Sequence, residues 1–148
     1  MSASFDFYKT VYMGKIDNED DFLLYRKRAT EYISNITAGK ADPYLFSDCE
    51  CEQPEVELDT RIQRKVDYAV CAVADQYVAV DIGRASVMKG YTESDGFIAS
   101  ETVGSHSRTF RSGYDVAKEA ENALYSVAAN YLAWTGLLYR GIPCTRHT

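Results

Sequence analysis

Apolar residues recur at intervals of three and four along residues 62–77, and no other pattern in the chain constrains the fold as strongly. This spacing places the apolar side chains on one face of an α-helix. The face consists of Ile62, Val66, Ala69, Val70, Val73, Ala74 and Tyr77. We predict a helix that starts after Asp59 or Thr60. It runs to about Asp81, and Gly83 is its natural stop.

A second helical pattern precedes the first, beginning at Asp17 or Asn18. Either residue is a favourable N-cap, and the three acids that follow suit the positive end of a helix dipole. One face is apolar, with Phe22, Tyr25, Ala29, Ile33 and Ile36. Gly39 ends this helix. Residues 5–13 have room for one or two helical turns, and their pattern leaves the choice open.

Residues 122–139 form an 18-residue stretch without a charged side chain, long enough to raise the question of a membrane span. Asn122, Ser126 and Asn130 recur every four residues, which favours a soluble helix with one polar face. We predict that this third helix opens at residues 112–115 and continues to about Leu138. Its apolar face is Val116, Ala120, Leu124, Val127, Tyr131, Trp134 and Leu138. A second, small and uncharged face is Asn122, Ser126, Ala129 and Ala133.

The helical period disappears between Arg84 and Gly113, where glycines punctuate a segment rich in Ser and Thr. A short β-hairpin over about residues 97–111, turning at Gly104 and Ser105, fits this segment best. The predicted fold is therefore all-α: a small bundle of three main helices with a short hairpin or extended loop between the second and third. A length of 148 residues suggests a single domain, 1–148.

The net charge of −6 is concentrated in one segment, because residues 42–59 hold seven acids and neither Lys nor Arg. The remainder of the chain has 15 acidic and 16 basic residues, so it is nearly neutral. Because the sequence shows no basic stripe, we do not expect sequence-independent binding of nucleic acid. We predict an acidic loop over about 41–57, with one apolar anchor at residues 44–46, and a short C-terminal tail over 141–148.

No combination of residues predicts catalysis. Cys49 and Cys51 are the most tempting metal ligands, but the remaining Cys and His residues fall at no ligand-pair spacing. Ser105 and Ser107 flank His106 in sequence. Adjacent residues of a strand point to opposite faces, so these side chains do not converge as a catalytic triad requires. Glycine-rich phosphate loops, HExxH and GxSxG are absent from the sequence. We therefore expect no catalytic, cofactor-binding or metal-binding residues, no enzyme activity, and a buried, inert Cys71.

Twelve tyrosines are a surplus for a chain of this size. Six of them lie on the helical stripes and are expected at the edge of the core: Tyr25, Tyr32, Tyr68, Tyr77, Tyr125 and Tyr131. Together with the small uncharged face, they leave more amphipathic surface than a three-helix monomer can bury. Self-association is the expected outlet for that surface.

Three segments in order resemble the head-to-tail connector (adaptor) family of tailed bacteriophages. They are residues 69–75 (AVCAVAD), 99–105 (ASETVGS) and 131–141 (YLAWTGLLYRG). The helix expected over residues 21–37 is consistent with the resemblance. It spans about residues 5–141 and covers the acidic loop poorly.

The resemblance implies a structural virion protein: one subunit of a closed ring, typically of twelve copies, assembled in the bacterial host cytoplasm. The ring would dock under the portal protein, extend a channel through which DNA passes without specific binding, and meet a stopper or tail-completion protein. The interface candidates are Glu101, Thr102, Val103, Gly104, Ser105, Thr135, Gly136, Leu137, Leu138, Tyr139 and Arg140. Gly104 is expected to need a positive φ, and Gly136 to allow close packing or an early helix bend.

Two other classes of function stay open at this point. A soluble helical protein-binding or regulatory module would also carry this charge and lack catalytic residues. A small metal-dependent enzyme would require stoichiometric metal held by Cys49 and Cys51.

Overall fold

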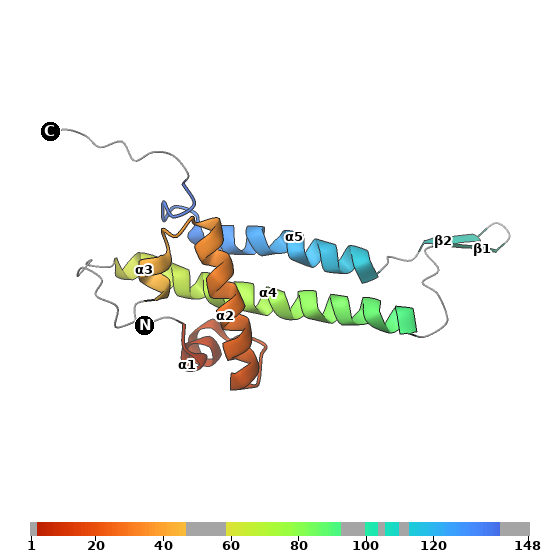
Figure 1. Cartoon of the computed structure of the whole chain (residues 1–148), viewed down its shortest axis with the longest axis horizontal. Helices are drawn as coiled ribbons and strands as arrows, with labels where there is room; N and C mark the ends of the chain where they lie inside the picture. Colours follow the sequence, from red (N-terminus) through yellow and green to blue (C-terminus); the bar gives the residue numbers. More distant parts are fainter. Residues whose placement is uncertain (1–2, 47–58, 93–99, 104–105, 110–112, 140–148) are drawn as a thin grey trace.

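The computed structural model describes residues 3–46, 59–92, 100–103, 106–109 and 113–139, and it is mostly helical (Figure 1). Side chains are described outside residues 86–117. The elements in chain order are α1 (Phe5–Phe7), the π-helix η1 (Tyr8–Tyr12), α2 (Glu19–Ile36), α3 (Asp42–Leu45), α4 (Thr60–Thr92), β1 (Ser100–Val103), β2 (His106–Thr109) and α5 (Gly113–Leu132).

Two long helices form the frame of the molecule. α4 and α5 lie side by side with opposite chain directions and share the most extensive contact between elements (Figure 1). α2 crosses α4 steeply, and α1 lies near the start of α2. The main core lies where these elements meet, and it includes Tyr8, Phe22, Ile33, Val70 and Leu132.

The predicted start and buried face of α2 are confirmed. Asn18 is the N-cap, and its Oδ1 accepts a hydrogen bond from the backbone N–H of Asp20 at 3.2 Å. Phe22, Ala29 and Ile33 are fully buried. Burial of a large apolar side chain contributes about 1.5–3 kcal/mol, so this stripe attaches α2 to the rest of the fold.

α4 is longer than predicted, because it passes through Gly83 and ends at Thr92. The expected stop at Gly83, and the loss of helical structure from Arg84 onward, are therefore wrong. A glycine inside a helix costs about 1 kcal/mol relative to alanine, and packing readily outweighs that amount. Gly83 is buried, and Arg84 beside it pairs with Glu121 of α5, so tertiary contact continues past the glycine.

The predicted end of the third helix lies too far along the chain. α5 stops at Leu132, whereas the pattern suggested Leu138. Trp134 has a φ of 68°, in the left-handed region that terminates helices. Its side chain therefore leaves the predicted apolar face and is 99% exposed.

The predicted acidic loop also starts too early, because residues 42–45 form α3. Pro43 lies in the first turn, where the missing N–H is tolerated, and Leu45 is buried as part of the apolar anchor. Residues 47–58 of that loop, with Cys49 and Cys51, lie outside the described residues, as does the tail from residue 140.

β1 and β2 pair antiparallel, with Ser100 opposite Thr109 and Val103 opposite His106. The pair lies beyond the adjoining ends of α4 and α5 (Figure 1). Gly104 and Ser105, on which the predicted turn depends, lie outside the described residues.

Candidate interaction surfaces

The interface candidates fall at two distant places. Glu101, Thr102 and Val103 belong to β1, at the end of the molecule where α5 begins. Thr135, Gly136, Leu137, Leu138 and Tyr139 follow the other end of α5. Figure 1 shows the full length of α5 between them, so one copy of the chain presents two separate surfaces. Arg140 lies outside the described residues.

We call residues 133–139 the exit turn, because the chain leaves α5 there and folds back on the core. The Thr135 hydroxyl donates to the carbonyl of Leu132 at 2.6 Å and accepts from the N–H of Leu137 at 3.3 Å. Leu137 is buried in the core and Leu138 packs against it. Gly136 has a φ of 78°, and a Cβ there would meet no atom within 4 Å. The glycine is therefore required by its backbone conformation, and close packing plays no part.

Lys40, just after the end of α2, contacts the last residue of the exit turn. Its ammonium group donates to the carbonyl of Tyr139 and lies 5.7 Å from the centre of the Tyr139 ring. A cation over an aromatic face is attracted by the ring quadrupole. Tyr139 is nevertheless 63% exposed. The turn thus has a buried anchor at Leu137 and an exposed aromatic side beside one positive charge.

A second surface lies at the opposite end of α2, where the N-terminal residues 3–16 wrap against α4. Tyr8 is completely buried beside Phe22, with ring centroids 4.5 Å apart. Its hydroxyl donates to Asp75 of α4 and accepts from the N–H of Ile16 at 2.9 Å. Burial, followed by the hydrogen bond to Asp75, raises the pKa of Tyr8 far above its ordinary value, so the group stays a donor.

Next to this contact is a cleft of about 270 Å³, which we call the acidic cleft. Ile16, Tyr25 and Val78 supply its apolar lining. The charged groups around it are Lys15, Asp17, Asp21 and Asp75. Asp17 is paired with Lys9 at 2.8 Å, and that hydrogen bond lowers the pKa of Asp17. Sequence reasoning missed this cleft, because its residues come from three separated segments.

Asp67 is a buried carboxyl on α4, and it ties two other segments to that helix. Gln63 donates one hydrogen bond to Asp67 and another to the carbonyl of Tyr44, each at 3.0 Å. The backbone of Ala3 also hydrogen-bonds to Asp67. Burial raises the pKa of Asp67 to about 6, although both hydrogen bonds oppose the shift. No local pattern in the sequence marks this residue.

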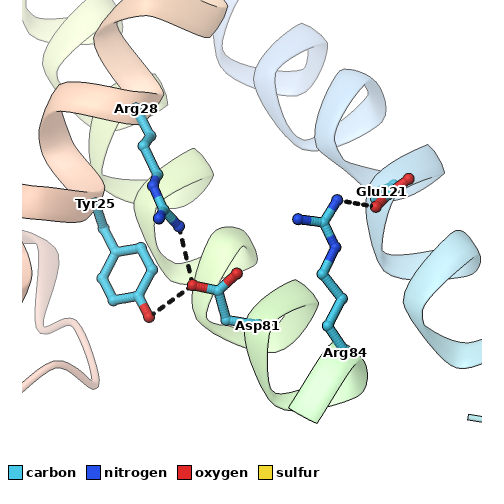
Figure 2. A network of polar contacts seen from close by, with 5 residues as sticks. All are labelled: Tyr25, Arg28, Asp81, Arg84 and Glu121. Atoms are coloured by element: carbon cyan, nitrogen blue, oxygen red, sulfur yellow. Dashed lines mark hydrogen bonds and ion pairs between the residues drawn. The ribbon is translucent and has the colours of Figure 1, made fainter. Parts of the chain in front are cut away.

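Polar contacts also join the three main helices, as Figure 2 shows. The Asp81 carboxylate of α4 accepts from the Tyr25 hydroxyl at 3.1 Å and pairs with Arg28 at 2.9 Å, both from α2. One turn further along α4, Arg84 pairs with Glu121 of α5. These side chains are partly exposed and have partners within the fold, so they act as structural contacts between helices.

The part of the chain that the structure describes contains no group of three or more His, Cys, Asp or Glu side chains arranged to hold a metal ion. Cys71 is fully buried, as predicted, and burial raises the pKa of its thiol to about 12. A thiol with that pKa is a poor nucleophile. Five of the six stripe tyrosines are half-buried core-edge residues as expected, and Tyr125 is 53% exposed.

Comparison of the chain with known protein families, with well-characterised proteins and with solved structures finds no match. Across the described ranges, no helix is both long enough and apolar enough to cross a membrane.

Proposed function

We propose that this chain is a ring-forming adaptor of a tailed-phage virion, which joins the portal of the capsid to a stopper or tail-completion protein and extends the DNA channel. Its body is the bundle of α2, α4 and α5, with the strand pair projecting from one end. The proposal starts from the resemblance of residues 69–75, 99–105 and 131–141 to head-to-tail connector proteins. It assigns no catalytic step to the chain.

One observation carries the proposal most directly: the exit turn displays Trp134, 99% exposed, and Tyr139, 63% exposed, on a segment anchored by buried Leu137. Trp and Tyr are the residues most enriched among those that dominate binding energy at protein interfaces. A fixed turn presents such side chains with little loss of conformational entropy on binding. These features support a role in which the chain acts through contacts with other proteins.

The separation of the two candidate surfaces supports a joint between unlike partners. A protein that joins two different partners needs two different surfaces, one for each partner. A strand pair can add to a sheet of a neighbour, whereas an exposed aromatic turn fits an apolar pocket. The strand pair and the exit turn supply one of each kind.

The test is assembly on a portal. The full chain is mixed with the portal protein encoded beside its gene, and particles are imaged by electron microscopy. The adaptor proposal predicts a ring of chains on one face of the portal. Portal particles without added density, or a gene neighbourhood of metabolic enzymes with no capsid genes, would favour a helical protein-binding or regulatory module.

A further inference from the structure

We propose that Trp134 of one copy inserts into the acidic cleft of a second copy, with Lys40 beside Asp21 at the rim. This contact rests on the proposed function in one respect: the adaptor role requires a repeated contact between subunits. The geometry of the single chain supplies both halves of it.

The first half is the backbone of Trp134. A bulky residue with a φ of 68° is an outlier, and strained backbone tends to be retained where it serves a function. Here the strain directs an indole fully into solvent, 99% exposed, although the next apolar residues turn inward. Lys40 lies beside the same turn through its contact with Tyr139. The exit turn and its neighbour therefore present one large exposed aromatic ring and one positive charge.

The second half is the acidic cleft, whose properties complement that surface. Its volume of about 270 Å³ is slightly below the range of small-molecule pockets and suits a single aromatic side chain. Its apolar lining suits the apolar indole, and the residues around it include Asp21 and Asp75 in addition to the Asp17 already paired with Lys9. Among the described residues that line the cleft, three are acidic and Lys15 is basic, so the excess charge is negative and attracts Lys40.

The two halves cannot meet within one chain. The exit turn lies where α2 stops, because Lys40 contacts Tyr139 there, whereas Asp21 lies in the first turn of α2. The 15 helical steps from Asp21 to Ile36 span about 22 Å. The contact must form between copies, and because the halves differ it is head-to-tail, the type of contact that closes into a ring or continues as a filament.

The first test is a zero-length cross-link with the full chain. A carbodiimide joins an amine to a carboxylate only when the two are in contact. An equal mixture of unlabelled and ¹⁵N-labelled chain is treated at high concentration, alone and on portal particles, and peptides are identified by mass spectrometry. We expect a Lys40–Asp21 link that joins one labelled and one unlabelled peptide. Trp134→Ala should reduce its yield at least tenfold, and the control Tyr125→Ala, at another exposed aromatic, should not.

The second test reverses the charges. Lys40→Glu alone and Asp21→Lys alone each place like charges together and should abolish self-association in sedimentation experiments. An equal mixture of the two variants restores opposite charges at every contact and should associate again. Failure of the mixture, or no Lys40–Asp21 link in either the free or the portal-bound chain, would overturn the contact.

The outcomes separate this contact from the adaptor role. Rings on the portal without the mixed-label link would refute the contact and leave the adaptor proposal standing. The link without any portal ring would support the contact and refute the adaptor role.

Discussion

The hydroxyl of Tyr8 donates a hydrogen bond to the carboxylate of Asp75, although 67 positions separate the two residues in sequence. The same oxygen accepts from the N–H of Ile16. The hydroxyl thus has two hydrogen-bond partners, one in the N-terminal segment and one in α4. This hydroxyl therefore attaches the N-terminal residues 3–16 to α4, and it lies beside the acidic cleft.

Tyr8→Phe removes this hydroxyl and leaves the buried N–H of Ile16 and the half-buried carboxylate of Asp75 without this partner. Because an unsatisfied buried donor or acceptor costs about 1–3 kcal/mol, we expect the free energy of unfolding to fall by about that amount in urea titrations. Tyr125→Phe is the matched control, since Tyr125 is exposed, and its effect should be close to zero. Equal stability of the two variants would show that the Tyr8 hydroxyl contributes nothing.

Two glycines allow steric and conformational requirements to be separated. A Cβ on Gly14 would overlap the ring of Tyr8, whereas a Cβ on Gly136 would meet open space at a φ of 78°. We expect Gly14→Ala to displace Tyr8 and to cost more than Tyr8→Phe does. Gly136→Ala should cost only about 1–2 kcal/mol, the penalty for a left-handed residue with a side chain. Thermal unfolding of both variants measures the order, and a larger loss at Gly136 would contradict it.

Features that depend on residues close together in the sequence could be predicted, and features that depend on distant residues could not. The Asn18 cap and the buried stripe of α2 depend on residues a few positions apart, so a local pattern predicts them. The predicted helix ends at Gly83 and Leu138 are wrong for two reasons. Packing on α5 carries α4 past Gly83, and the left-handed backbone of Trp134 follows the end of α5 at Leu132. The Tyr8–Asp75 contact and the acidic cleft join distant segments, and no spacing rule finds such pairs.

The pH dependence of stability should report Asp67. Burial raises the pKa of Asp67 from its ordinary value of 3.8 to about 6, so the native state binds the proton more tightly than the unfolded chain does. The contribution of Asp67 to stability is therefore greatest below pH 3.8 and is lost as the pH rises to 6 and above. Asp67→Asn, which stays neutral, should be more stable than the wild type at pH 7.5.

That advantage should shrink between pH 6 and pH 4, because the wild-type carboxyl becomes neutral as well. Urea unfolding of both proteins at pH 4.5 and pH 7.5 measures the difference directly. An advantage of Asp67→Asn that is the same at both pH values would mean that the charge of Asp67 has no cost in the fold.

The ion pairs of Figure 2 should differ in value. Asp81 contacts two side chains of α2, Tyr25 and Arg28, while the ion pair of Glu121 within the described part of the chain is with Arg84. We expect Asp81→Ala to lower the free energy of unfolding by about 1 kcal/mol. Glu121→Ala should lower it by about 0.5 kcal/mol or less, as for other exposed pairs. In 1 M salt the second effect should vanish while part of the first remains, since the Tyr25 hydrogen bond is less screened.

Trp134→Gly should make the single chain more stable while it weakens association. Glycine relieves a left-handed strain of about 1–2 kcal/mol, and the added freedom of the unfolded chain offsets about 0.5–1 kcal/mol of that gain. The indole is 99% exposed, so its removal leaves no cavity, and the net gain should be about 0.5–1 kcal/mol in urea unfolding of dilute protein. Trp134→Ala keeps the strain and should leave stability unchanged. A loss of stability in both variants would mean that the indole packs on its own chain, and it would then be unavailable to the cleft of a neighbour.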